Sequence, residues 1–230
     1  MEKTRESAVV MEYLSEETID NFVIEHEFIL SFHLQQIENS IDQFDVAYDY
    51  LRGLKDNAEI SNTEREQIWE RISDIGNAIF RIVQTLVPTV ARKREKEQQE
   101  LTRKRGEALR YLMKLSKEDA KSLNDMRNRF VHFDEDIDDW FYEQRVAGVN
   151  SGDLKAISKQ IFMKETILHQ GDTATILCYD ILGGTVHSFG KVFSIHDFHK
   201  TMKIVSSSLV EACKLFQVMC DDITEITILC

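Results

Sequence analysis

Proline and glycine, the residues that most often interrupt helices, are scarce in this chain. One proline, Pro88, and nine glycines occur in 230 residues. This scarcity favours long uninterrupted helices over a strand-rich sandwich. The hydrophobic fraction of 43% excludes disorder of the whole chain. A chain of this length suits one or two domains and can bury a sizeable core.

Cysteine pairs and long apolar runs are also missing. The four cysteines, Cys178, Cys213, Cys220 and Cys230, include no C-x-x-C pair. No early apolar segment is long enough for a signal peptide or a membrane span. We therefore expect a cytoplasmic protein with reduced thiols and no membrane partner. We also expect Cys213 and Cys220 to be small core residues of the last helix.

Common catalytic motifs and an excess of positive charge are lacking as well. The sequence has no glycine-rich phosphate loop, no G-x-S-x-G elbow and no H-E-x-x-H motif, which excludes the common NTPase, hydrolase and zinc-protease classes. Its net charge of -12 argues against a protein coated in nucleic acid. One stretch is basic nevertheless, either as a solvated helix face or as a weak RNA-binding patch that steers phosphates. Its basic residues are Arg92, Lys93, Arg94, Lys96, Arg103, Lys104 and Arg105.

Apolar residues at alternating spacings of four and three predict two long helices. We expect residues 1–15 to be flexible. A capping box of Thr63 and Glu66 should open the second helix, which ends at Pro88. Because the polar link at 57–62 is short, the two helices should pair antiparallel. The first stripe is Leu30, Leu34, Ile37, Ile41, Phe44, Tyr48 and Leu51, and the second is Ile68, Ile72, Ile75, Ile79, Ile82 and Leu86.

Three further helices follow in the pattern. The helix over about 90–115 has a weak stripe, so it should project from the bundle or cross its edge. Ser116 and Asp119 should open a fourth helix, and a final helix should return to the bundle. The third stripe is Leu101, Ala108, Leu112 and Leu115. The fourth is Leu123, Met126, Phe130, Phe133, Ile137 and Trp140, and the last is Phe198, Met202, Val205, Leu209, Ala212, Phe216 and Met219.

Before the final helix the pattern becomes typical of strands. Glu165–Leu168, Thr173–Asp180 and Thr185–Ile195 are rich in β-branched and aromatic residues, and turn residues such as Gly183-Gly184 separate them. So small a sheet is not stable alone. We therefore predict one mainly α domain over residues 16–230. It is an antiparallel helical bundle with a small antiparallel β hairpin or meander inserted at about 164–195.

The fourth helix carries Arg127, Asn128 and His132 in an R-N-x-x-x-H pattern. A guanidinium can hold a phosphate through two parallel bonds, and an imidazole exchanges protons near neutral pH. With Met126, Phe130 and Phe133 pointing inward, Arg127 falls about 90° to one side and His132 about 130° to the other. Asn128 lies between them on the outer face. A site here needs a covering surface, and the same face of a second copy is the simplest one.

The longer run R-N-R-F-V-H-F-D-E at 127–135, followed by Trp140, resembles the HEPN superfamily (higher eukaryotes and prokaryotes nucleotide-binding domains). The resemblance implies a bundle of the first, second, fourth and last helices. It also implies a homodimer in which two motifs share a cleft, and cleavage of RNA without a metal or another cofactor.

In the mechanism that this resemblance implies, Arg127 holds the scissile phosphate and stabilises the charge of the transition state. His132 is the general base or acid. Asn128 binds a phosphate oxygen or orients the histidine, and Asp136 supports His132 by raising its pKa. Arg129, nearer the core, should instead form a salt bridge at its edge. The leading hypothesis is a toxin or antiviral defence ribonuclease restrained by an antitoxin or another regulatory partner, and the competing one is a non-catalytic helical dimer that binds protein or RNA.

Other titratable residues fit structural roles better. The acidic residues at 134–139 spread around the helix, which favours a solvated face over a cation site. His26 and His33 should be buried and hydrogen-bonded on the first helix. His196 and His199 are spaced for zinc, but no cysteine or carboxylate at suitable spacing completes four ligands. We therefore expect no metal site.

Overall fold

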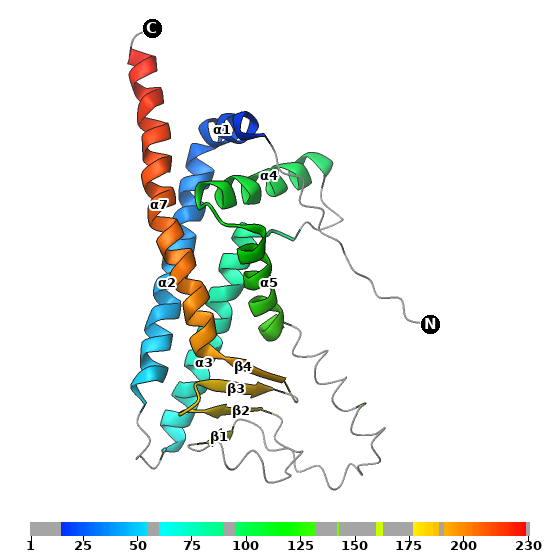
Figure 1. Cartoon of the computed structure of the whole chain (residues 1–230), viewed down its shortest axis with the longest axis vertical. Helices are drawn as coiled ribbons and strands as arrows, with labels where there is room; N and C mark the ends of the chain where they lie inside the picture. The colour runs from blue at the N-terminus through cyan, green and yellow to red at the C-terminus, as the bar shows by residue number, and fades with distance from the viewer. Residues whose placement is uncertain are drawn as a thin grey trace.

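The computed structural model describes residues 15–54, 60–89, 95–131, 142, 160–162, 177–188 and 191–228. The chain is mainly helical, with a small sheet directly before the last helix (Figure 1). This arrangement confirms the predicted fold class. Within the described ranges, no helix combines the length and the apolar character that a membrane crossing requires.

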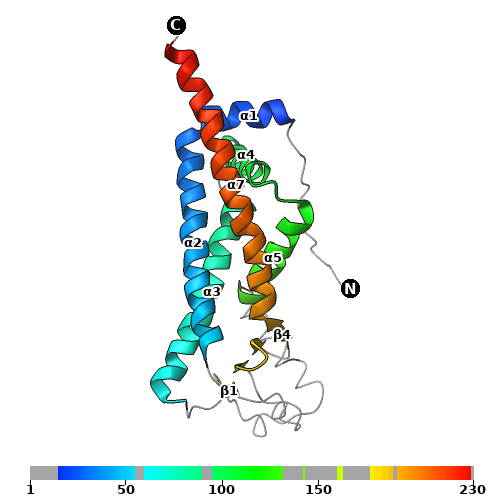
Figure 2. The ribbon, with the colours of Figure 1, turned by 60° about the vertical axis from the view of Figure 1, so that its left-hand side comes forward.

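Four helices form the bundle: α2 (Glu27–Gly53), α3 (Asn62–Leu86), α5 (Lys117–Val131) and α7 (Ile195–Ile228). α2 packs against α3 and α7, and α5 packs against the same two helices. α2 and α3 lie side by side and antiparallel in both views (Figures 1 and 2). The first, second, fourth and last predicted helices therefore build the bundle as expected.

The predicted apolar stripes make the core. All seven stripe residues of α2 and all six of α3 are buried. Burial of one large aliphatic or aromatic side chain stabilises a fold by about 1.5–3 kcal/mol, so these stripes explain why the helices pair. On α7 the last two stripe residues are only partly buried, and the others are in the core. Those core residues of α7 are Phe198, Met202, Val205, Leu209 and Ala212.

The predicted single first helix is in fact two, because the chain leaves helical geometry at His26 (φ -124°, ψ 27°). The His26 backbone N–H still donates to the Phe22 carbonyl, and its imidazole stacks on the Phe22 ring with centroids 4.1 Å apart. α1 (Glu16–Glu25) therefore turns across the end of the bundle, where it packs against α4. His26 and His33 are partly rather than fully buried.

The cap of α3 also differs from the prediction. Ser61, not Thr63, is the N-cap: its hydroxyl accepts from the Glu64 N–H at 3.2 Å, and the Glu64 carboxylate accepts from the Ser61 N–H at 2.9 Å. Ser61 has the extended backbone (φ -65°, ψ 161°) that aims a hydroxyl at the third residue of the helix. Thr63 already lies inside the first turn, so the predicted Thr63–Glu66 box is wrong.

α4 (Lys96–Leu112) crosses the bundle rather than running along it (Figure 1), as its weak stripe predicted. Ala108, Leu112 and Leu115 are buried as expected, but Leu101 is 41% exposed, so its predicted burial is wrong. The near-absence of apolar residues in the first half of α4 leaves that half with little to bury. α4 contacts α1, α2, α3 and α7, and its buried residues lie in its second half, between Gly106 and Leu112.

The sheet has the order β1 (Gln160–Phe162), β2 (Leu177–Asp180), β3 (Thr185–Ser188) and β4 (Lys191–Ser194). β2, β3 and β4 form the predicted antiparallel meander. β1 pairs parallel with β2, which a meander does not include.

Two predicted strand limits change as well. The single strand expected over Thr185–Ile195 is two strands, β3 and β4, and Ile195 already begins α7. The Gly183-Gly184 turn is correctly placed. Gly184 has a φ of +58°, a left-handed backbone conformation that glycine adopts without the strain a side chain would add. The strand expected at Glu165–Leu168 lies outside the described residues.

Candidate functional site

The motif helix α5 starts where the sequence predicted. The Ser116 N–H and hydroxyl donate to Asp119 Oδ2 at 3.0 and 2.7 Å, and the Asp119 N–H donates back to the Ser116 hydroxyl at 3.1 Å. This capping box satisfies N–H groups that the first turn leaves without a helical partner. The helix then continues to Val131 and includes two residues of the motif.

The inward face of α5 fixes its rotation against the bundle. Leu123 and Met126 are buried, and the half-buried Phe130 packs on the core. The Phe130 ring meets the rings of Phe193 on β4 and Phe198 on α7, with centroids 5.2 and 5.8 Å apart. One aromatic side chain therefore joins α5 to the sheet and to the last helix. This contact fixes the directions of Arg127 and Asn128 on the same helix.

Arg127 leans against α3 rather than standing free. Its side chain is half-buried, and its guanidinium carbon lies 5.5 Å from the centroid of the Phe80 ring. Its Nη1 donates a long bond of 3.4 Å to Asn124 Oδ1, and its enclosed Nε has no hydrogen-bond partner among the described residues. Within that part of the chain no carboxylate pairs with it. An anion at Arg127 would therefore bind to the terminal nitrogens of the guanidinium and not to the enclosed Nε.

The rest of the motif is only partly placed. Asn128 is half-exposed, next to Arg127. His132 and Asp136 lie outside the described residues. Arg129 does not form the predicted salt bridge at the core edge among the described residues: it is exposed, and its Nη1 donates to the Val192 carbonyl of β4 at 3.4 Å.

The described residues of the basic stretch lie on α4 and not on the motif helix α5. Arg92, Lys93 and Arg94 lie outside the described residues, whereas Arg103, Lys104 and Arg105 are half-exposed on α4. Arg103 pairs with Glu100 at 3.0 Å. In Figure 1, α4 lies near the start of α5. Arg127 is ten residues further along α5, about 15 Å along the helix axis, so the two features occupy different regions.

A shallow groove of ≈440 Å³ runs on another side of α5, between it and the start of α7. Met126 and Phe198 form its apolar part, and Arg127 does not line it. Charges of both signs surround it, and the acidic ones would repel RNA phosphates. The charged lining residues are Glu118, Lys121, Asp125, Arg129 and Asp197.

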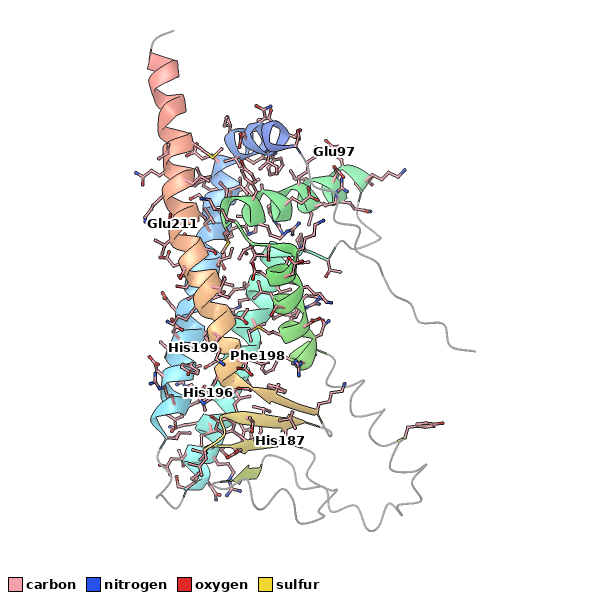
Figure 3. All side chains as sticks on the ribbon, viewed as in Figure 1. Glu97, His187, His196, Phe198, His199 and Glu211 are labelled. Atoms are coloured by element: carbon pink, nitrogen blue, oxygen red, sulfur yellow. The ribbon has the colours of Figure 1, made fainter. Side chains whose placement is uncertain are left out.

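A ring cluster that the sequence did not predict joins α2 to α7. The Tyr48 hydroxyl lies 3.0 Å from His196 Nδ1, and the His199 ring stacks on the Tyr48 ring with centroids 3.9 Å apart. His199 Nε2 is 4.0 Å from Asp45 Oδ1, and burial is the main cause that lowers its pKa. Figure 3 shows both histidines on the first turns of α7. Their spacing was visible in the sequence, but their tyrosine partner was not.

These histidines have structural partners instead of a metal-like setting. Among the described residues, no three His, Cys, Asp or Glu side chains are grouped as a metal ion would need. Cys213 is exposed on α7, so its predicted place in the core is wrong; its neighbour Ala212 occupies the buried face. The Cys220 side chain lies outside the described part of the chain.

No protein-family model matches this chain, and no curated protein or solved structure is significantly similar to it. The arguments for function therefore rest on the residues and their geometry.

Proposed function

We propose that this chain is a HEPN-like, metal-independent endoribonuclease in which Arg127 and His132 carry the chemistry. The observation that supports this most is the state of Arg127: a half-buried guanidinium over the Phe80 ring, with no carboxylate among the described residues paired to it. A preordered cation of this kind can bind a phosphate with little reorganisation. The bundle of α2, α3, α5 and α7 is also the architecture that the resemblance implies.

In this mechanism the fork of Arg127 holds two oxygens of the scissile phosphate. His132 removes the proton from the ribose 2'-hydroxyl, whose oxygen attacks phosphorus, or protonates the departing 5'-oxygen. Asn128 binds a third phosphate oxygen or orients the imidazole. A second copy closes the site and adds its own motif, and a regulatory protein that covers this face would restrain a toxin or defence enzyme.

The test is cleavage of mixed RNA by purified protein in EDTA. Wild type should cleave, and Arg127→Ala and His132→Ala should each lose about 100-fold or more in rate. Arg127→Lys should recover only part of the rate, since lysine keeps the charge but lacks the fork.

The matched control is Arg81→Ala on α3, where an exposed arginine donates to Gln43 Oε1 at 3.2 Å. It removes the same charge and should leave cleavage unchanged. Circular dichroism checks that every variant keeps its helicity. Inactive wild type, or equal cleavage by wild type and Arg127→Ala, would contradict the proposal.

A second candidate function, a non-catalytic helical dimer, is favoured by an exposed apolar stripe around the α1–α2 corner. Phe28 is 85% exposed and Phe32, one helical turn later, 52%; Ile24 and Ile29 are 43% and 41% exposed. Neighbouring apolar side chains exposed to this degree are typical of an interaction surface. If this function is correct, wild type is a dimer in sedimentation velocity, Phe28→Glu is a monomer, and neither protein cleaves RNA.

A further inference from the structure

A cavity of ≈530 Å³ lies at one end of the bundle, among α1, the end of α4 and α7. Ile19, Leu115 and Leu215 provide apolar lining from three parts of the chain. A cavity of about 150 Å³ with aliphatic and aromatic walls already accommodates benzene. This cavity therefore has room for a phenyl ring and part of a neighbouring side chain.

The charged residues buried in the cavity wall need no countercharge from an occupant. Glu107 is 7% and Arg110 8% exposed. Arg110 Nη1 donates to the main-chain carbonyl of Leu86, and both charged side chains take part in interactions within the chain. Buried charges are tolerated when they are compensated in this way. An uncharged apolar group is therefore the kind of occupant that the cavity fits.

Phe28, at the same end of the bundle, is an apolar side chain without a cover. It lies in the first turn of α2, and at 85% it is the most exposed large hydrophobic residue of the described ranges. It does not line the cavity of its own chain. Ile24, Ile29 and Phe32 beside it are 43%, 41% and 52% exposed. An aromatic side chain in this position is a typical interface anchor when the partner supplies a pocket.

The charges around Phe28 and around the cavity have opposite signs. Residues 20–32, which carry Phe28, contain three acids and no lysine or arginine. At the cavity, Lys114 is exposed and its charge reaches Glu211 on α7, whose carboxylate also pairs with Lys214 at 2.9 Å. Two lysines therefore face one acid at this edge of the cavity. Opposite charges of this kind orient two protein surfaces for contact.

We propose that the cavity receives Phe28 of a second copy of this chain, and that each copy of the dimer fills the cavity of the other. A two-fold axis permits this exchange, because it repeats every contact between two different residues in both directions. The acids beside Phe28 then lie near Lys114 of the other copy. This inference rests on the second candidate function, the helical dimer, and names the site that receives its exposed apolar stripe. It does not involve Arg127, which does not line the cavity.

The test is sedimentation velocity of the full chain and of two variants. Wild type should be a dimer. Phe28→Ala removes the ring and Leu215→Trp fills the cavity, so each should weaken dimerisation at least about thirtyfold, as expected for a central anchor residue. A mixture of the two variants should associate more tightly than either alone, since the open cavity of Phe28→Ala can receive Phe28 of Leu215→Trp.

The control for loss of an exposed apolar side chain is Leu182→Ala, at a residue that is 53% exposed after β2, and it should dimerise like wild type. Circular dichroism checks that Leu215→Trp keeps its helicity. A monomeric wild type would overturn both the cavity contact and the dimer on which it rests. If Phe28→Ala is monomeric but Leu215→Trp dimerises like wild type, the dimer stands and the cavity contact is wrong. The cavity contact is also wrong if the mixture associates no better than either variant alone.

A charge exchange tests the same contact without filling the cavity. Lys114→Glu and Glu27→Lys should each weaken dimerisation about tenfold at low salt, because each charge pair occurs twice in a two-fold dimer. The protein that carries both changes should regain affinity. Glu38→Lys, an equal charge change at an exposed residue further along α2, should dimerise like wild type. Unchanged dimerisation of Lys114→Glu, or equal losses in Glu38→Lys and Glu27→Lys, would contradict the contact.

Discussion

The ring of Phe130 lies directly on the backbone of Gly76: a Cβ placed on Gly76 would be 2.8 Å from Phe130 Cδ1. This approach lets α5 lie close to α3. It also sets the rotation of α5, so that Arg127, three residues earlier, meets Phe80 one turn further along α3. The glycine at position 76 therefore positions the candidate phosphate-binding arginine.

Gly76→Ala should lower the free energy of unfolding by about 1–3 kcal/mol, because the added methyl forces the packed Phe130 ring to shift. Alanine is otherwise the better helix former by about 1 kcal/mol, so the sign of the change tests the packing. Urea unfolding followed by circular dichroism measures it. Gly53→Ala is the control, since among the described residues no atom outside its own helix backbone and chain neighbours lies within 4 Å of a Cβ there, and it should be neutral or stabilising. Equal effects at both positions would show that the Phe130 contact is unimportant.

Ser61→Ala should cost about 1 kcal/mol of stability, since it removes the hydroxyl that caps α3. Thr63→Ala should cost less, because Thr63 is exposed in the first turn. Thermal or urea unfolding of the two variants distinguishes the observed cap from the one expected at Thr63. A larger loss of stability in Thr63→Ala than in Ser61→Ala would contradict Ser61 as the N-cap of α3.

The hydroxyl of Tyr48 should stabilise the junction of α2 and α7 through His196. Tyr48→Phe removes the 3.0 Å hydrogen bond but keeps the ring that stacks on His199, so it should cost about 1 kcal/mol. A double-mutant cycle with His196→Leu should give a coupling energy of about 1 kcal/mol. Strictly additive losses would mean that the bond does not stabilise the fold.

Acid should weaken the fold through His33. Burial, followed by the charge of Arg105, lowers the pKa of His33 from 6.5 to about 4. Between these values the unfolded chain binds more protons, so the contribution present at pH 7 is lost as the pH falls from 6.5 towards 4. The ring is only half-buried, and solvent screening reduces the contribution to about 1 kcal/mol. His33→Gln should therefore lose less stability than wild type between pH 7 and pH 4.5 in urea unfolding; parallel losses would contradict the assignment.

The helical part of the fold was predictable because each stripe is a local property. Leu30 to Leu51 and Ile68 to Leu86 recur at helical spacing, and any arrangement that buries them needs those two helices to pair. The break at His26 was not predictable, since it depends on the contact between α1 and α4. The shift of the cap from Thr63 to Ser61 depends on the backbone angle at one residue, and both hydroxyls offer the same local chemistry.

The sequence by itself determined the bundle helices, the turn at Gly183-Gly184 and the Arg127–Asn128 pair on α5, because periodicity and turn chemistry act over a few neighbouring residues. Only the tertiary structure decided that Arg127 rests on Phe80, that His196 meets Tyr48, and that α1, α4 and α7 enclose a cavity. Those contacts join residues far apart in the chain, and their geometry depends on how whole helices pack.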